Sequence, residues 1–220
     1  MIMEADYIEQ NRRVYDNLAE EFEEKLDIRT ENNKHIIENF SRELEKRCDL
    51  QNCEILELGP GAGYLCKILS EKGVKMTAIE FSEKMANVCK KTAPLTHVIV
   101  DEFLAHDFKD QQYDGVLEIA FLHLFPSRDT PKVLEKIKKL LKPKGVLYTG
   151  TTVHQNSSEG LFPKINFKKP FLRFRRRFTK NEFEKTLING GFKILQSKSY
   201  IDHEEEGKVW IDYIVEANRN

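Results

Sequence analysis

The sequence predicts an α/β fold in which a seven-stranded, mostly parallel sheet ends in a C-terminal antiparallel hairpin. From residue 54 to residue 149, short apolar runs with the character of buried strands alternate with amphipathic helical patterns, as in a parallel sheet. The last two strand-like runs, 192–200 and 208–216, are joined by an acidic loop without a helix. Because a parallel connection needs about a dozen residues or more, these two strands must be antiparallel.

Helical periodicity precedes the first strand and recurs between the later ones. Apolar side chains share one face in 7–26 and again in 35–44, so two amphipathic helices are expected before the sheet. A further helix begins at the capping box Thr179 to Glu182, with Phe178 and Phe183 as its hydrophobic staple, and ends at Gly190-Gly191. The remaining expected elements are strands at 54–58, 74–79, 97–100, 114–120 and 146–149 and helices at 64–70 and 131–141.

Length, composition and charge favour one globular domain. The chain has 220 residues, of which 40% are hydrophobic, enough for a sizeable core. Its 35 basic and 36 acidic side chains nearly cancel, so the overall charge favours no polyanionic partner. No N-terminal apolar run resembles a signal peptide, and no stretch approaches the roughly 18 apolar residues of a membrane span. We therefore expect a cytoplasmic monomer or homodimer that acts on a small molecule, without a membrane or nucleic-acid partner.

The four cysteines are Cys48, Cys53, Cys66 and Cys89, and they form no C-x-x-C pair. No histidine cluster accompanies them. The sequence therefore predicts reduced, mostly buried thiols and no metal site.

Three glycines at alternate positions, Gly59, Gly61 and Gly63, separate the first strand from the following helix, and Glu57 stands two residues before them. Glycine tolerates positive φ and has no side chain, so a cofactor can approach the backbone there. A dinucleotide fingerprint would need glycine at position 64, where this chain has Tyr64. The pattern acid-x-G-x-G-x-G instead resembles the first motif of the class I S-adenosylmethionine-dependent methyltransferases.

A second phrase of the same family lies one strand later. Glu80 stands at the carboxyl end of a strand, where an acid can accept hydrogen bonds from both ribose hydroxyls of a cofactor. The phrase acid-x-S-x-x-M that begins there resembles the family's second motif and implies that Phe81 and Met85 flank the adenine. Met85 could equally be an ordinary core residue of the helix that Ser82 caps.

The resemblance covers most of the chain and implies further cofactor contacts. The segment 14–22 resembles the N-terminal cap of small-molecule methyltransferases, in which Tyr15 closes over the methionine end of the cofactor; Tyr15 could also be the aromatic member of a core stripe. Asp101 and Glu102 both follow the strand 97–100 at the place of an acid that meets the adenine amine, and similar sequences favour Glu102. The residues expected at the cofactor are Tyr15, Glu57, Gly59, Gly61, Gly63, Glu80, Phe81, Met85, Glu102, Phe103, Glu118 and Ala120.

These resemblances imply a Rossmann-like methyltransferase fold with S-adenosylmethionine as the cofactor. The chain would divide into N-terminal cap helices (1–50), a cofactor-binding core (51–150), a lid or substrate insertion (151–178) and a C-terminal helix and hairpin (179–220). The implied activity is methyl transfer to an O or N atom of a small molecule. The alternatives are an RNA or protein/peptide methyltransferase that uses the basic segment described below, a non-catalytic S-adenosylmethionine-binding partner subunit and, more distantly, a nicotinamide enzyme.

Methyl transfer from a sulfonium is an in-line displacement that depends mainly on alignment, so a general base is optional. His123 is the candidate base, because it follows the carboxyl end of the fourth strand and its ordinary pKa near 6.5 suits proton transfer. The alternative is that His123 orders its loop by hydrogen bonding to the backbone. His154, after the fifth strand, is a second candidate base and a candidate substrate contact.

The segment 151–178 is unusually long for a connection, which usually marks a functional loop. Between residues 164 and 180 it has eight basic residues and no acid. If 172–178 is a strand, Arg173, Arg175 and Arg177 share one face, and Phe174 and Phe178 the other. The basic side chains could form a solvated or salt-bridged face, bind an acidic small substrate, or bind RNA. Among them, the candidate substrate contacts are Arg173, Arg175 and Arg177, together with His154.

Overall fold

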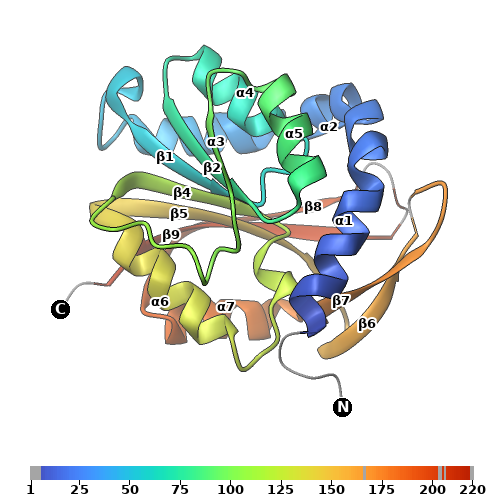
Figure 1. The fold of residues 1–220 in the computed structure, drawn as a ribbon. Coiled ribbons are helices and arrows are strands. Elements are labelled where there is room, and N and C mark those ends of the chain that lie inside the picture. Colours follow the sequence, from blue (N-terminus) through green and yellow to red (C-terminus); the bar gives the residue numbers. More distant parts are fainter. Residues whose placement is uncertain (1–5, 166, 203–204, 206, 219–220) are drawn as a thin grey trace.

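Seven strands form one sheet through the centre of the molecule (Figure 1). They are β1 (Glu54–Leu58), β2 (Lys75–Glu80), β3 (His97–Val100), β4 (Tyr113–Ile119), β5 (Leu141–Val153), β8 (Phe192–Ile201) and β9 (Val209–Ala217). Their order is β3-β2-β1-β4-β5-β9-β8. The strands β1 to β5 are parallel, and β9 runs antiparallel to both β5 and β8, which confirms the predicted sheet. This computed structural model describes residues 6–165, 167–202, 205 and 207–218.

The register of the parallel strands brings their carboxyl ends to one edge of the sheet. β1 lies between β2 and β4, with Glu57 opposite Ala78 on one side and Leu117 on the other. Side chains and loops that follow these three strands therefore meet, although they come from distant parts of the sequence. In open α/β sheets this edge is where ligands bind.

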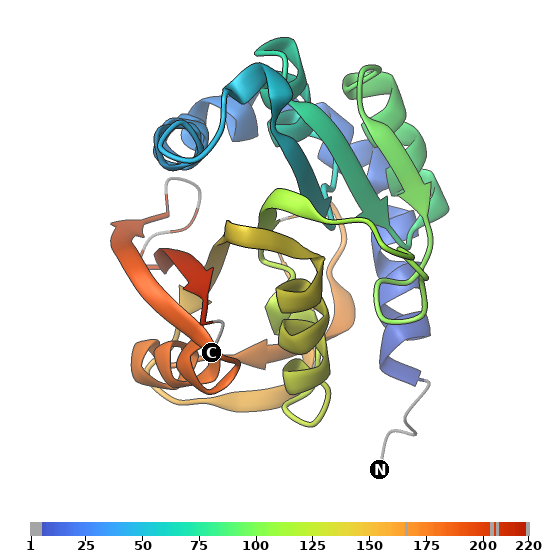
Figure 2. The same ribbon diagram turned by 90° about the vertical axis from the view of Figure 1, so that its left-hand side faces the viewer.

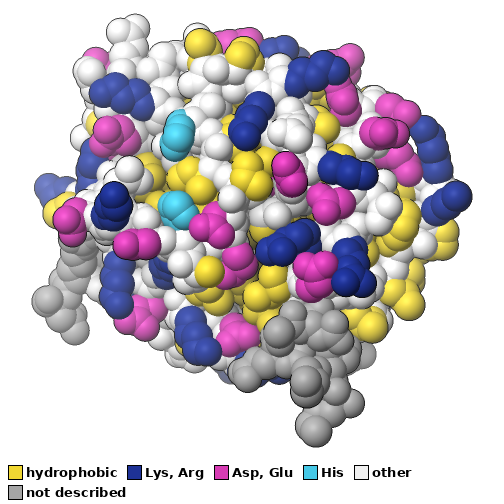
Figure 3. Space-filling view, viewed as in Figure 1, with side chains coloured by type: hydrophobic (Ala, Val, Ile, Leu, Met, Phe, Trp, Pro, Cys, Tyr) yellow, Lys and Arg dark blue, Asp and Glu magenta, His cyan; other side chains and the backbone are white. Residues whose placement is uncertain are grey.

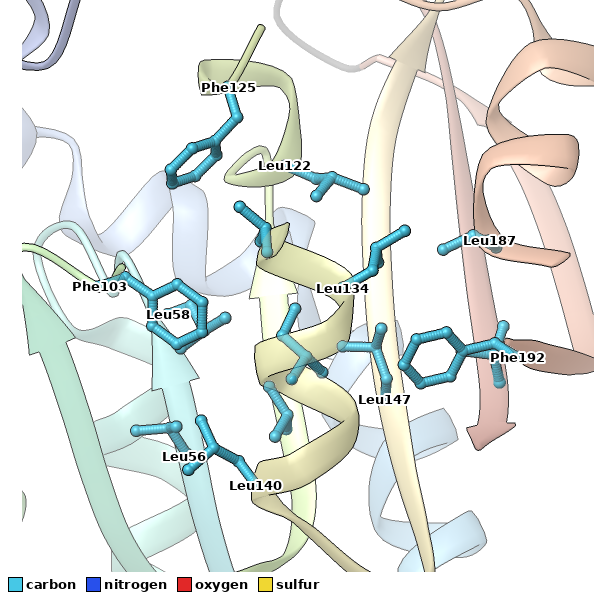
Figure 4. Close-up of a cluster of buried hydrophobic side chains, with 14 of the residues drawn as sticks. Leu56, Leu58, Phe103, Leu122, Phe125, Leu134, Leu140, Leu147, Leu187 and Phe192 are labelled. Carbon is cyan, nitrogen blue, oxygen red and sulfur yellow. The ribbon is translucent and has the colours of Figure 1, made fainter. Parts of the chain in front are cut away.

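Helices cover both faces of the sheet (Figure 1). On one side lie α3 (Lys34–Leu44), α4 (Tyr64–Glu71) and α5 (Glu83–Thr92); on the other lie α6 (Thr130–Leu140) and α7 (Lys180–Asn189). The side chains of α6 and α7 pack on the sheet in the cluster drawn in Figure 4, which includes Leu134 of α6, Leu187 of α7 and Leu147 of β5. Because each fully buried leucine contributes about 1.5–3 kcal/mol, this cluster fixes the sheet that carries the site.

The caps of two helices follow the sequence signals. The Ser82 hydroxyl accepts a hydrogen bond from the Met85 backbone N–H, and the Thr179 hydroxyl accepts one from the Glu182 N–H, each at 3.1 Å. Phe178 and Phe183 are in edge contact, with ring centroids 5.0 Å apart, which confirms the staple. The Glu182 side chain forms an ion pair with Arg176.

Three helices, and not two, precede the sheet. The first predicted helix is interrupted at Lys25, which separates α1 (Asp6–Glu24) from α2 (Leu26–Asn32). The helix α3 follows these two. Figures 1 and 2 show α1 running from α5 toward the strands β6 (Ser158–Lys164) and β7 (Phe171–Arg177). The Asn11 side chain accepts a hydrogen bond from the Phe174 N–H at 2.8 Å, so α1 and β7 are joined.

The segment 151–178 is more regular than a loop. β5 continues to Val153, and β6 and β7 then form a separate antiparallel hairpin, of which the sequence predicts only the second strand. The predicted alternation along β7 is confirmed. Phe174 is buried and packs on Tyr7 of α1, with ring centroids 5.3 Å apart, while the arginines at alternate positions face the opposite way, toward the cavity described below.

The prediction of four reduced thiols is wrong for one pair, because Cys48 and Cys53 form a disulfide. After α3 the chain makes a tight turn and a short 3-10 helix, Leu50–Asn52, which brings the two Cα atoms to 6.0 Å. That separation lies in the usual range for a disulfide and does not depend on a C-x-x-C spacing. Cys66 and Cys89 are buried free thiols, as predicted.

The surface seen in Figure 3 carries acidic and basic side chains interspersed, in keeping with the near-zero net charge. None of the helices in the described part of the chain is long and apolar enough to cross a membrane.

Candidate active site

A cavity of about 560 Å³ opens at the carboxyl ends of β1, β2 and β4. Its walls also include side chains of α1, of the hairpin β6–β7 and of the β8–β9 loop. Small-molecule sites usually have volumes of about 300–1,000 Å³. The cavity therefore has the size and the position in the fold of a cofactor and substrate site.

The glycine turn after β1 forms one wall, and its three glycines have different roles. Gly59, Gly61 and Gly63 have φ of 64°, 56° and 82°, a region that favours glycine. Gly59 and Gly61 line the cavity, whereas Gly63 does not. A Cβ on Gly63 would lie 2.8 Å from the sulfur of Cys89, so this glycine permits α4 to pack on α5. A Cβ on Gly61 would lie 3.6 Å from the ring of Phe22, at ordinary van der Waals contact, so it would meet another residue of the cavity wall and not a neighbouring helix.

Two buried carboxylates stand beside this turn. Glu57 is 3% exposed and accepts a hydrogen bond from the Cys66 thiol at 2.8 Å; Glu80 is 5% exposed and accepts one from the Ser82 N–H at 3.0 Å. Burial raises the pKa of each carboxyl to about 7. Both line the cavity at the ends of adjacent strands, where carboxylate oxygens can accept hydrogen bonds from hydroxyl or amine groups of a ligand.

The acids after β3 both reach the cavity. The Glu102 carboxylate accepts hydrogen bonds from the backbone N–H groups of Leu104 and Ala105, at 2.9 and 2.7 Å. Asp101 bonds instead to the His106 ring at 2.9 Å. Since both acids line the cavity, the choice of Glu102 over Asp101 stays a prediction.

Aromatic rings form much of the remaining wall at this end. Tyr15 lies with its ring centroid 6.1 Å from those of both Phe22 and Phe81, so it belongs to an aromatic stripe and also lines the cavity. Phe103 also lines the cavity, although it is largely buried, and its ring is in edge contact with that of Phe121, with centroids 5.7 Å apart. Such rings offer flat apolar surfaces on which a nucleobase can stack.

Met85 does not line the cavity, although the sequence places it among the cofactor contacts. It is fully buried in a cluster with Val14 and Leu18 of α1. Met85 therefore lies where a core residue of the helix that Ser82 caps is expected.

Glu118 is also absent from the cavity wall. Its carboxylate accepts hydrogen bonds from the N–H groups of Phe121 and Leu122, at 3.1 and 3.2 Å, and from the Thr149 hydroxyl, and burial raises its pKa to about 8. It holds the turn after β4, in which Ala120 has a positive φ of 59° and lines the cavity. Glu118 thus supports the cavity from behind.

His123 lies in the turn after β4, is 3% exposed and lines the cavity. Its Nε2 atom lies 3.2 Å from Nη1 of Arg173, and because a guanidinium can only donate, Nε2 accepts this bond and Nδ1 carries the proton. Burial, together with the charges of Arg175 and Arg173, holds the pKa of His123 well below its usual value. The ring is therefore neutral, with its basic lone pair already engaged, which disfavours a role as general base.

His154 follows β5 and is similarly engaged. Its Nε2 atom lies 3.2 Å from the Thr152 hydroxyl and 3.4 Å from Nη2 of Arg175. Burial and the charge of Arg175 lower its pKa to about 4. Neither histidine that the sequence nominates as a base has a free, basic nitrogen directed at an acceptor.

The three arginines on one face of β7 all line the cavity. Arg173 is 5% exposed, Arg175 donates to the Thr152 hydroxyl, and the Arg177 guanidinium lies 3.8 Å from the ring centroid of Phe162. Arg176, on the other face, pairs with Glu182 at 2.6 Å and is not in the wall. Arg176 thus has the ion pair that one interpretation of the basic segment expects, whereas none of the described carboxylates pairs with the three arginines in the cavity.

The sequence did not single out several residues that the structure brings into the wall. Tyr200 of β8 and Trp210 of β9 are register partners whose rings stack 6.4 Å apart, and Thr152 contacts both His154 and Arg175. The pairing of these two rings could have been found from the sequence, through the register of the C-terminal hairpin. Their position at the cavity depends on how β9 sits against β5.

Comparison with known proteins agrees with this geometry. Residues 55–145 match the family model of the methyltransferase domain. Arsenite methyltransferase of Mus musculus is 31% identical over 117 residues, which are 45% of this chain and 30% of that protein. The chain spans less than half the length of each of the curated relatives it matches.

Solved structures share the fold over most of the chain. A methyltransferase from Methanosarcina mazei described as SAM-dependent superposes with a TM-score of 0.68 at 16% identity, covering 79% of this chain and 96% of that one. The glycopeptide N-methyltransferase MtfA, solved in complex with S-adenosylhomocysteine, has a TM-score of 0.66 at 13% identity and covers 85% and 90%. The chain thus contains a region that matches the methyltransferase domain, on a fold that it shares with S-adenosylmethionine-dependent methyltransferases, and the acid-glycine cradle lies within the matched residues.

Proposed function

We propose that this protein transfers the methyl group of S-adenosylmethionine to an O or N atom of a small molecule. The observation that carries the proposal is one continuous cavity. It has the glycine turn and the buried Glu80 at the sheet edge, and polar side chains of the hairpin β6–β7 in the same wall. A cofactor cradle and room for a second molecule are what a group transfer requires.

The residues present fit the cofactor. Gly61 leaves the backbone open where a Cβ would narrow the cavity, Glu80 would accept hydrogen bonds from the ribose hydroxyls, and Glu102 or Asp101 would meet the adenine amine. Bound there, S-adenosylmethionine supplies an electrophilic methyl group on a sulfonium. The protein's own task is then to align the acceptor and exclude water, an effect for which effective molarities of about 10⁵–10⁸ M are known.

Two segments form the cover of this cavity, α1 and the hairpin β6–β7. Gln10 donates to the Leu172 carbonyl at 2.6 Å, and Glu21 accepts from the Lys168 N–H at 2.7 Å. Because these bonds join the two segments along their length, we expect them to act as one lid over cofactor and acceptor.

The direction of the arginines argues against RNA as the acceptor. Arg173, Arg175 and Arg177 point into a cavity that also holds the cofactor cradle, whereas an RNA-binding surface would present them outward.

Thermal-shift titration tests the cofactor, and a methyl-transfer assay tests turnover. S-adenosylmethionine and S-adenosylhomocysteine should each raise the melting temperature, and NADH should not. Stabilisation by NADH alone would overturn the proposal. Transfer of labelled methyl groups into a small-molecule pool, with peptide and tRNA pools beside it, then identifies the acceptor class. Binding without transfer to any pool would favour a non-catalytic subunit.

A further inference from the structure

The strand β7 places three guanidinium groups on one wall of the cavity. Arg173, Arg175 and Arg177 alternate along the strand, so their side chains leave the same face of the hairpin. Among the residues that the structure describes, no carboxylate forms an ion pair with any of them. The Nε atoms of all three are buried and have no hydrogen-bond partner in this part of the chain.

Burial of these guanidinium groups without a counter-charge is unfavourable. Arg173 is only 5% exposed, and a cation taken out of water is destabilising unless an anion pairs with it. Burial and the charge of Arg173 lower the pKa of Arg175 to about 10. Two acids of the described part of the chain lie nearby in the same cavity wall, Asp202 and Glu205. Each of them forms an ion pair with Lys208 at 3.1 Å.

Apart from Asp202 and Glu205, the groups that neighbouring elements bring to the arginines are neutral or positive. His123 is neutral, and its bond to Arg173 leaves Nδ1–H as a buried donor without a partner. His154 is neutral as well, and because a guanidinium can only donate, its Nε2 atom accepts from Arg175 and from the Thr152 hydroxyl. Lys164 also lines the cavity. The wall therefore offers several donors and a positive potential.

We propose that the methyl acceptor carries an oxyanion, a carboxylate or a phosphate, that Arg173 and Arg175 bind in this cavity. The inference rests on the proposed methyl transfer and names its substrate class. Guanidinium groups bind both oxyanions through paired N–H···O bonds, and a bound anion supplies the missing counter-charge. His123 orients Arg173 through Nε2, so it is a positioning residue for the anion.

The test measures anion binding directly, with inorganic phosphate for the phosphate class and succinate for the carboxylate class. Each is titrated at constant ionic strength, and the melting temperature is followed with and without S-adenosylhomocysteine. We expect a saturable rise with one of the two probes, and the probe that binds identifies the class. Two flat titrations would overturn the proposal.

Variants locate the binding. Arg173→Gln and Arg175→Gln should each weaken binding of the effective probe at least tenfold and leave S-adenosylhomocysteine affinity within about twofold. Arg176→Gln is the matched control, because it removes the same charge from the same strand but from the face outside the cavity. An equal loss in Arg176→Gln would show a general charge effect and refute the site.

The two proposals can fail separately. If Arg173→Gln does not fold, the less buried Arg175 carries the test, with Arg175→Lys expected to retain part of the binding since it keeps the charge but loses the paired donors. Anion binding without S-adenosylhomocysteine binding would overturn the methyl transfer alone. Normal S-adenosylhomocysteine binding with no anion binding would overturn the substrate class alone.

Discussion

Gly63 and Gly61 belong to one motif, yet an alanine at each should have a different main effect. Gly63→Ala should mainly lower the stability of the protein, and Gly61→Ala should mainly weaken S-adenosylhomocysteine binding. Gly63→Ala places a Cβ 2.8 Å from Cys89 Sγ, 3.2 Å from its Cα and 3.3 Å from its carbonyl oxygen. The sulfur could rotate away, but the backbone atoms move only if α5 shifts. Overpacking of this kind costs about 1–3 kcal/mol. The left-handed φ of 82° adds roughly 1–2 kcal/mol for a residue with a Cβ.

Gly73→Ala is the control that separates these two costs. Gly73 has a φ of 90°, and its Cβ would approach the side chain of Gln51 at 3.2 Å, an exposed group that can move. We expect a loss of roughly 1–2 kcal/mol for Gly73→Ala and about 2–5 kcal/mol for Gly63→Ala. Gly61→Ala should resemble Gly73→Ala in stability, but its methyl group enters the cavity and should weaken S-adenosylhomocysteine binding at least tenfold.

Urea denaturation at 25 °C gives the free energies of unfolding, and isothermal titration of S-adenosylhomocysteine gives the affinities. The slope of the free energy against urea should not change, since the exposed surface is the same. The reasoning is refuted if Gly63→Ala is no less stable than Gly73→Ala. It is equally refuted if Gly61→Ala binds S-adenosylhomocysteine as tightly as the wild type.

Three further predictions follow from the buried acids and the helix caps. Glu80→Gln should weaken S-adenosylhomocysteine binding about tenfold at pH 8, because hydrogen bonds to a carboxylate are stronger than those to an amide; an unchanged titration would exclude Glu80 as a ribose contact. The free energy of unfolding of the free protein should fall as pH rises from about 6.5 to 8, above the range in which the lowered pKa values of His123 and His154 act in the opposite direction. Glu80 and Glu118 have pKa values raised by burial to about 7 and 8, so each binds its proton more tightly in the folded state, and that stability is complete near pH 4.5 and lost through pH 7–8. Glu118→Gln should make this decrease in the free energy of unfolding smaller. The prediction is contradicted if urea titrations at about pH 6.5 and 8 give the same decrease for the variant as for the wild type. Thr179→Ala should lower the free energy of unfolding by about 1 kcal/mol through loss of the α7 cap, whereas Thr186→Ala, inside the same helix, should cost less; equal losses would refute the cap.

Local patterns in the sequence determined the fold and pointed to the cofactor that we propose. The E-x-G-x-G-x-G turn, the acid at the end of β2 and the final hairpin depend on backbone conformation and strand periodicity over a few residues, so they can be recognised without the rest of the chain. The alternation of arginine and phenylalanine along β7 was predictable for the same reason.

Only the tertiary structure decided which of these residues face the cavity. Met85 and Gly63 satisfy the sequence motif, but the packing of α5 against α1 and α4 turns both into the interior. The disulfide between Cys48 and Cys53 depends on the path of the chain after α3, which no short motif encodes.

The arginines show the division most clearly. The sequence determined that Arg173, Arg175 and Arg177 share a face, because side chains alternate along any strand. It could not determine whether that face meets solvent, an acid or a cavity. The answer depends on α1, which covers the phenylalanine face, and on His123 from the turn after β4 and Thr152 from β5, which contact the arginines. Contacts between residues so far apart in the chain are set by the whole fold, and these contacts make the arginine face a wall of the methyl-transfer site that we propose.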